Sequence, residues 1–145
     1  MFNDPALAAT WSPRLLAVLR IVTGYLFLLH GTSKLFGVPH VAMFDNLQLF
    51  SLLGLAGVLE LAGGALLIAG LFVRPTAFVL SGFMAVAYFM GHATKGNPLL
   101  PMLNQGELAV AWSFLFLYFA AVGGGAWALD NVIGETRARL RAVTP

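Results

Sequence analysis

The sequence predicts an all-α integral membrane protein, an antiparallel bundle of four transmembrane helices with a short interfacial helix or re-entrant segment between the first two. Its 145 residues are 59% hydrophobic and only 10% charged. Their mean hydropathy is +0.86, which is typical of a polytopic membrane protein and not of a soluble domain. Four apolar segments nearly exhaust the chain. We therefore expect a single membrane domain over residues 1–145.

The first predicted helix covers about residues 14–36. Ser12 offers an N-cap and Pro13 the first helical position. The segment superficially resembles a signal peptide, but Arg20 interrupts its apolar region and no A-x-A cleavage site follows it. We expect the helix to be retained. The next segment, 38–50, is too short to span a membrane and mixes apolar with polar residues, which favours an interfacial helix or a re-entrant loop.

The second predicted helix, residues 52–73, carries one ionisable side chain, Glu60. Each Leu, Ile, Val or Phe near the centre of a span favours insertion by about 0.3–0.6 kcal/mol, whereas an acid there costs about 2.5–3.5 kcal/mol. The many apolar residues outweigh the acid, but its carboxyl group still needs a partner. Gly57, Glu60 and Gly64 share one helical face, so another helix can approach the acid closely.

Two further helices are predicted after a short antiparallel turn. Pro75 opens the third helix, about residues 75–92, and the fourth covers about 106–129. Asn104 and Glu107 are predicted to form an N-cap pair before the fourth helix. A short polar tail, 130–145, follows it.

The distribution of lysine and arginine predicts the orientation of the chain in the membrane. With both termini on one side, that side carries most of the basic residues: Arg14, Arg20, Arg74, Arg137, Arg139 and Arg141, against Lys34 and Lys95 opposite. The positive-inside rule then favours a multi-pass protein of the bacterial cytoplasmic (inner) membrane with both termini inside. The loops 37–51 and 93–105 would face the periplasm. The glycine faces of the second helix also permit a homo-oligomer.

Composition excludes several classes of function. The net charge is only +2 and three of the eight basic residues lie near the C-terminus, so a nucleic-acid partner is not supported. The chain has no cysteine, which excludes disulfides, thiol redox chemistry and thiolate metal sites. Any electrons that the protein handles must therefore pass through a bound cofactor or substrate.

Each of the four predicted helices places a titratable group in the periplasmic half. His30 and Lys34 are one turn apart on the first helix and could meet Glu60 of the second. Intramembrane ionisable groups commonly bind substrates or relay protons, so these three are candidates for ligand binding or proton handling. The structural alternative is that Lys34 reaches the headgroups while His30 and Glu60 only hydrogen-bond across the helix pair.

The third and fourth helices supply the remaining candidates. Tyr88 and His92 lie one turn apart and could complete a pocket, or serve as an interfacial aromatic and a helix-terminal cation. Glu107 is a further candidate, although a first-turn acid of a capped helix has a structural role of its own. Phe114 and Tyr118 follow Glu107 along one face and are the predicted pocket wall.

Four motifs in order resemble the successive signatures of DoxX-type membrane proteins. They are HGTSKLFG at 30–37, ELAGG at 60–64, GLFVR at 70–74 and NQGE at 104–107. The resemblance covers about residues 14–128 and implies a four-helix inner-membrane protein. Some members of that family are associated with thiosulfate:quinone oxidoreductase and others with membrane redox complexes. The sequence has NQGE where the family pattern leads us to expect NGGE, which keeps the acid but could alter the turn before it.

The leading hypothesis is a membrane subunit that binds quinone or a similar lipophilic redox molecule and works with a partner oxidoreductase subunit, surrounded by membrane lipids. Whether the chain is itself an enzyme stays open. The alternative is a non-enzymatic scaffold, assembly or anchoring subunit, and a small transporter is a third class. Two histidines on different helices could ligate haem b, but nothing else in the sequence supports it, and no spacing motif defines a metal site.

Overall fold

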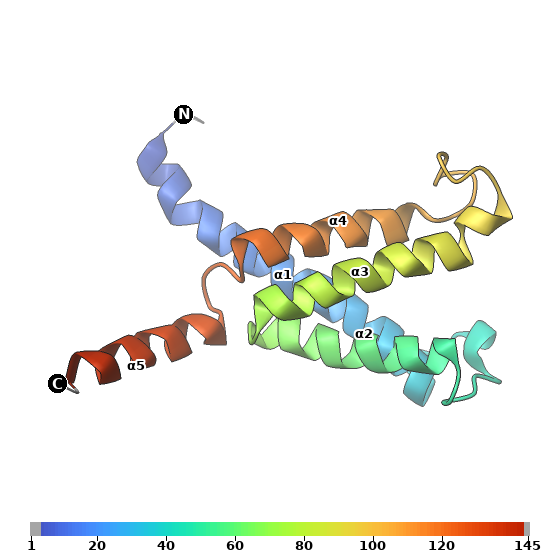
Figure 1. Ribbon diagram of the computed structural model, residues 1–145, viewed down its shortest axis with the longest axis horizontal. Coiled ribbons are helices and arrows are strands. Elements are labelled where there is room, and N and C mark those ends of the chain that lie inside the picture. Colours follow the sequence, from blue (N-terminus) through green and yellow to red (C-terminus); the bar gives the residue numbers. More distant parts are fainter. Residues whose placement is uncertain (1–3, 144–145) are drawn as a thin grey trace. The chain divides into compact units, whose positions relative to one another are not determined.

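The structure is a computed structural model that describes residues 4–143. Among these residues it contains five α-helices, two short 3₁₀ turns and no strand (Figure 1). The chain forms two compact units, one of residues up to Val73 together with those from Gly124 onward, and one of Arg74–Gly123. The first unit contains α1, α2 and α5, and the second contains α4 and all but the first residue of α3. The all-α prediction is confirmed.

Helix α1 covers Pro5–Phe36 and begins earlier than predicted. Asp4 is its N-cap, because the Asp4 carboxylate accepts a hydrogen bond from the Ala6 amide at 2.9 Å, and Pro5 takes the first helical position. The predicted start at Ser12 and Pro13 is therefore wrong, since Asp4 and Pro5 supply the same signals upstream. Pro13 lies inside the helix instead.

Helix α2 covers Leu52–Ala69 and is shorter than the predicted 52–73. Its N-cap is Ser51, whose hydroxyl accepts from the Gly54 amide at 3.1 Å. It ends at Gly70, which adopts the left-handed conformation with φ 69°. Between α1 and α2 the chain forms only the 3₁₀ turn η1 (Ala42–Phe44) within irregular structure. Its predicted place at the membrane interface stays a prediction.

Helix α3 covers Val73–Gly91, and a second 3₁₀ turn, η2 (Ala93–Lys95), follows it. Helix α4 covers Glu107–Val122 and not 106–129. It ends early because Gly123 and Gly125 both take positive φ angles, 89° and 70°. The chain then forms a further helix, α5 (Leu129–Val143), which covers most of the predicted polar tail. The last two residues of that tail lie outside the described range.

Three of the helical segments are long and apolar enough to cross a membrane: Pro5–Phe36, Leu52–Ala69 and Val73–Lys95. Helix α4 is apolar but has only 16 residues, about 24 Å at 1.5 Å per residue. A bilayer core is about 30 Å thick. The chain is thus a membrane protein with three candidate spans among residues 4–143, and the fourth span stays a prediction.

Candidate functional site

Glycines bring α1 and α2 into close antiparallel contact. A Cβ atom on Gly64 would lie 2.7 Å from the Gly24 carbonyl oxygen, and one on Gly31 would collide with the backbone nitrogen of Leu61. The second half of α1 therefore runs antiparallel along α2, with Gly31 beside Leu61 and Gly24 beside Gly64. Such close approach of backbones is how membrane helices pack when small residues line their contact. It confirms the predicted small-residue face of α2.

The closely packed pair holds a buried ion pair. The Lys34 ammonium donates to Glu60 Oε1, and the two side chains are only 10% and 6% exposed. Lys34 is thus the partner that the sequence required for the acid. The second carboxylate oxygen, Glu60 Oε2, is buried without a hydrogen-bond partner among residues 4–143. A buried carboxylate oxygen normally accepts a hydrogen bond, so this atom has capacity for a further donor.

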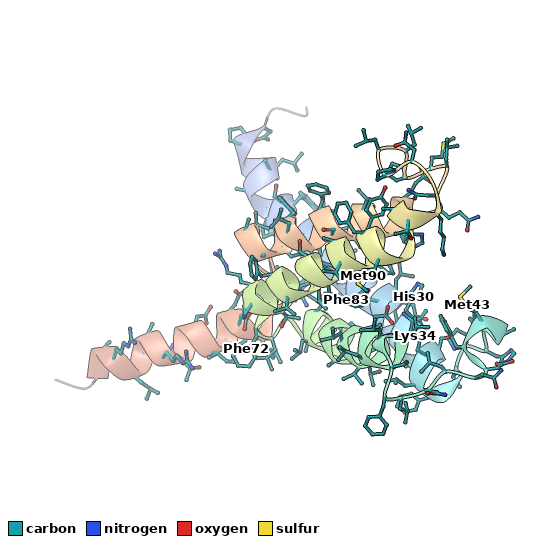
Figure 2. The ribbon with its side chains drawn as sticks, turned by 45° about the vertical axis from the view of Figure 1, so that its right-hand side comes forward. His30, Lys34, Met43, Phe72, Phe83 and Met90 are labelled. Atoms are coloured by element: carbon teal, nitrogen blue, oxygen red, sulfur yellow. The ribbon has the colours of Figure 1, made fainter. Side chains whose placement is uncertain are left out.

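A cavity of about 390 Å³ lies on the outer part of α1. Its lining is mainly apolar, from α1 and from the segment that contains η1, and its polar members are His30 and Ser33. The Ser33 hydroxyl is also buried without a hydrogen-bond partner within the described range. Figure 2 shows His30 and Lys34 along α1, with Met43 on the neighbouring turn. His30 and Met43 both line the cavity.

Phe44 connects the cavity to the ion pair. Its side chain lines the cavity, and the Lys34 Nζ lies 5.5 Å from the centre of its ring. This distance is within the range of a cation–π contact. Lys34 is one helical turn from His30, so the ammonium and the imidazole lie on the same side of α1. The structure therefore brings His30, Lys34 and Glu60 to one end of the α1–α2 pair.

Arg20 forms a second buried polar cluster at the other end of this pair. Its side chain is fully buried, and within residues 4–143 its guanidinium donates to backbone carbonyls alone. Nε donates to Gly124 at 2.8 Å, Nη1 to Leu67 and to Ile68 (2.9 Å for the latter), and Nη2 to Trp127 at 3.3 Å. Leu67 and Ile68 belong to the last turn of α2, whose carbonyls lack the usual amide partner four residues on. Arg20 therefore caps α2 and ties the segment after Gly123 to it.

Asp130 completes this second cluster. Its carboxylate accepts from the Phe72 amide at 2.8 Å and the Val73 amide at 2.9 Å, at the start of α3. Its own amide donates to the Gly70 carbonyl at 3.0 Å. The carboxylate also lies close enough to act electrostatically on Arg20. Arg20 and Asp130 together fix the connection between α2 and α3, which is a structural role.

In the second unit, Tyr88 and His92 belong to a hydrogen-bonded cluster centred on Asn104. The Tyr88 hydroxyl donates to the Pro98 carbonyl at 2.6 Å and accepts from Asn104 Nδ2 at 3.1 Å. His92 Nδ1 donates to the Asn104 carbonyl at 3.2 Å, and its ring stacks near that of Tyr88 with centres 6.5 Å apart. These contacts order the loop between α3 and α4.

The N-cap pair predicted before α4 is not formed. The N-cap of α4 is Gly106, with no side-chain hydrogen bond, and Glu107 is the first helical residue. Asn104 Oδ1 instead accepts from the Gly106 amide at 3.0 Å within the loop. Gln105, which replaces the glycine expected between them, has φ 60°. That conformation suits glycine better than glutamine, which gives a physical reason for the family pattern.

Glu107, Phe114 and Tyr118 lie on the exposed face of α4. Phe114 is 69% and Tyr118 52% exposed. Glu107 lines a separate open cavity of about 540 Å³ together with Gln105. The buried face of α4 consists of other residues: Ala109, Trp112, Phe116 and Phe119. The roles predicted for Glu107, Phe114 and Tyr118 in ligand binding stay predictions.

Sequence reasoning did not find Ser33, Asp130, or the roles of Arg20 and Asn104. Ser33 had a visible signal, since it precedes Lys34 and lies three residues after His30. Arg20 was noticed as a charge inside an apolar span, but its partners are backbone carbonyls that leave no mark in a sequence. Among residues 4–143, no three potential His, Cys, Asp or Glu ligands gather as a metal site would require.

The chain is similar to known proteins over most of its length. The DoxX family model matches residues 15–93. A protein from Haemophilus influenzae, described as an uncharacterized protein, is 50% identical over 123 residues, which cover 83% of this chain and 92% of the relative. No solved structure matches the chain. The match spans the glycine-packed helix pair and its ion pair, and the chain belongs to the DoxX family.

Proposed function

We propose that the chain is a membrane subunit of an oxidoreductase system and binds quinone or a similar lipophilic redox molecule in the cavity on α1. The proposal depends on one observation: Glu60, a buried acid with one oxygen that accepts no hydrogen bond from the described residues, adjoins an apolar cavity through Lys34 and Phe44, and His30 and Ser33 line that cavity. Ligand sites are typically mainly apolar cavities of about 300–1,000 Å³ with few polar groups. The cavity, at about 390 Å³, meets that description.

The chemistry of these groups suits a quinone head. Reduction of a quinone to a quinol takes up two electrons and two protons. His30 can donate to a ring carbonyl and pass on a proton, and the Lys34 and Glu60 pair can supply a second one. The Ser33 hydroxyl can donate to the other carbonyl. The chain has no cysteine, so we assign the electrons to a partner oxidoreductase subunit.

The proposed setting is the bacterial inner membrane, with both termini inside. The cavity then belongs to the periplasmic half, because it is built from the last turns of α1 and the segment that follows. A quinone reaches such a site from the bilayer, where its tail remains. The exposed apolar residues around the cavity, such as Met43, which is 82% exposed, would contact lipid or this tail.

The test is binding of a ubiquinone analogue and a menaquinone analogue to the protein in nanodiscs, for wild type and Glu60→Gln. We expect the substitution to weaken binding at least tenfold, because the amide removes the charge that orients Lys34. Glu135→Gln is the matched control, since Glu135 is an exposed acid of α5. Equally tight binding by Glu60→Gln, or binding by neither protein, would contradict the proposal.

A scaffold or anchoring role is the second candidate, and a specific observation favours it. Lys34 already neutralises Glu60 inside the helix pair, so the pair could serve only to fix helix packing. On this hypothesis Glu60→Gln lowers the thermal stability of the protein but leaves the activity of its complex intact. The chain should also co-purify with a soluble partner from native membranes.

A further inference from the structure

Helix α5 is exposed along nearly its whole length. Every residue from Asn131 to Ala142 is exposed, although several are large and apolar. Val132 is 60%, Ile133 37% and Leu140 64% exposed. Figure 1 shows α5 extending away from α1 and α2. A soluble helix of this kind would bury such residues against a core.

These apolar residues share one face of α5. At about 100° per residue, Leu129, Ile133 and Leu140 fall within about 60° of one another together with Thr136, and Val132 lies about 40° beyond Thr136. Arg139 and Arg137 lie about 80° to either side of this face, and Arg141 lies beyond Arg137. Ala138, Ala142 and Glu135 lie opposite. An apolar stripe flanked by arginines is the pattern of helices that lie in the membrane interface.

The first turn of α5 is held at the end of the membrane spans. Asp130 accepts hydrogen bonds from the amides of Phe72 and Val73 and donates its own to Gly70, between α2 and α3. Asn131 Nδ2 donates to the Gly125 carbonyl at 2.9 Å. Trp127, just before the helix, is 64% exposed. Tryptophan is enriched at membrane interfaces, which favours a position at headgroup level for the start of α5.

We propose that α5 docks on the surface of the bilayer, with its apolar face among the lipids and Arg137, Arg139 and Arg141 on anionic headgroups of that leaflet. Charge complementarity supports this occupant, since residues 136–142 contain three arginines and no acid. Continuity supports it too, because the anchored first turn starts where two spans leave the membrane. A second copy of the chain or a protein partner has neither argument in its favour.

The test uses the full-length protein in nanodiscs and the absence of native cysteine. Thr136→Cys places a label on the apolar face, and Ala138→Cys places one on the opposite face only two residues away. A nitroxide on each reports contact with dissolved oxygen, which concentrates in lipid, and with an aqueous nickel complex. In nanodiscs with phosphatidylglycerol we expect the label at 136 to favour oxygen and the label at 138 to favour nickel.

The lipid charge provides the second arm of the test. Each arginine near an anionic surface contributes about 1 kcal/mol, or about fivefold in the ratio of docked to free helix. Replacement of Arg137, Arg139 and Arg141 by glutamine, or nanodiscs of phosphatidylcholine alone, should therefore lower that ratio by on the order of a hundredfold. These arginines are exposed, so the variant is expected to fold like wild type.

Three results would overturn the proposal. The label at 136 could remain as open to nickel as the label at 138 in anionic nanodiscs, which means that α5 stays in water. Both labels could be shielded from oxygen and nickel alike, which indicates a protein partner. Spin–spin coupling between labels in the same nanodisc, unchanged by lipid charge, would identify a second copy as the occupant.

Discussion

Arg20 and Glu60 are both buried charges in the α1–α2 pair, and they differ in how fully their hydrogen-bonding groups are used. The Arg20 guanidinium donates to four backbone carbonyls. The Glu60 carboxylate has one partner, Lys34, and an oxygen that no other residue in 4–143 contacts through a hydrogen bond. A cavity adjoins the second charge through Phe44.

This difference indicates a structural role for Arg20 and a candidate functional role for Glu60. A buried charge such as Arg20, with four of its five N–H donors directed at fixed carbonyls, has little left to offer a ligand, and its contribution is to hold segments together. A buried acid with unused capacity near an apolar cavity can still accept a donor from a ligand. The predictions below test this distinction, from the largest effect to the smallest.

The largest loss of stability is expected on substitution of Arg20. Arg20→Met keeps an apolar chain of similar length but removes the arginine donor from four buried carbonyls, of which Leu67 retains the Gly70 amide, so we expect a loss of about 3–5 kcal/mol of unfolding free energy. Unfolding of the purified protein in mixed micelles measures it. Arg14→Met is the control, because Arg14 is exposed. A variant at Arg20 as stable as that control would show that the carbonyl contacts contribute nothing.

A smaller effect is expected when the ion pair is broken. Lys34→Met should cost about 2–3 kcal/mol, less than Arg20→Met, because a buried acid that loses its counterion can neutralise itself by protonation. The double variant Lys34→Met with Glu60→Gln should recover to within about 1 kcal/mol of wild type. The same unfolding measurement gives the coupling between the two residues. Additive losses would mean that the two side chains do not interact.

Substitution of Gly31, in the glycine contact beside the ion pair, should lower the free energy of unfolding by an intermediate to small amount. Gly31→Ala directs a methyl group into the backbone of Leu61, which should cost about 1–3 kcal/mol through overpacking. Gly82→Ala in α3 is the control, since a Cβ there meets no described atom within 4 Å. Alanine is the better helix former by about 1 kcal/mol, so the control should be neutral or stabilised. Thermal melts of both variants decide whether the contact is as tight as the structure has it.

Apolar patterning was sufficient to predict most of the fold. The apolar runs predicted the four apolar helices, and the shared face of Gly57, Glu60 and Gly64 predicted the close approach of another helix, which is α1 in the structure. The boundaries were less predictable, because a second set of start signals at Asp4 and Pro5 preceded the one at Ser12. The length of α4 depends on backbone conformations at Gly123 and Gly125 that composition alone does not specify.

The candidate site was only partly predictable, because its partners come from different segments. A single acid in an apolar span required a partner, and Lys34 was one of two basic candidates on the first helix. The choice of Lys34 over His30 depends on the rotation of α1 against α2, which the sequence does not determine. Likewise, the segment around η1 that lines the cavity has no helical or strand periodicity in its sequence from which its path could be predicted.

The smallest change in stability is expected on substitution of Ser33, which is also the sharpest test of whether the polar groups near Glu60 bind a ligand or only stabilise the fold. Its hydroxyl is buried without a partner in the described chain, so Ser33→Ala should leave stability unchanged or raise it by up to about 1 kcal/mol. Ser113→Ala is the control, because the Ser113 hydroxyl donates to the Ser81 carbonyl at 3.0 Å and its loss should lower stability by about 1 kcal/mol. Quinone-analogue binding should weaken only for Ser33→Ala. If Ser33→Ala instead destabilises the protein as Ser113→Ala does, and binding is unchanged, the hydroxyl has a structural partner such as a buried water. The hydrogen-bonding groups near Glu60 would then be as fully used as those around Arg20.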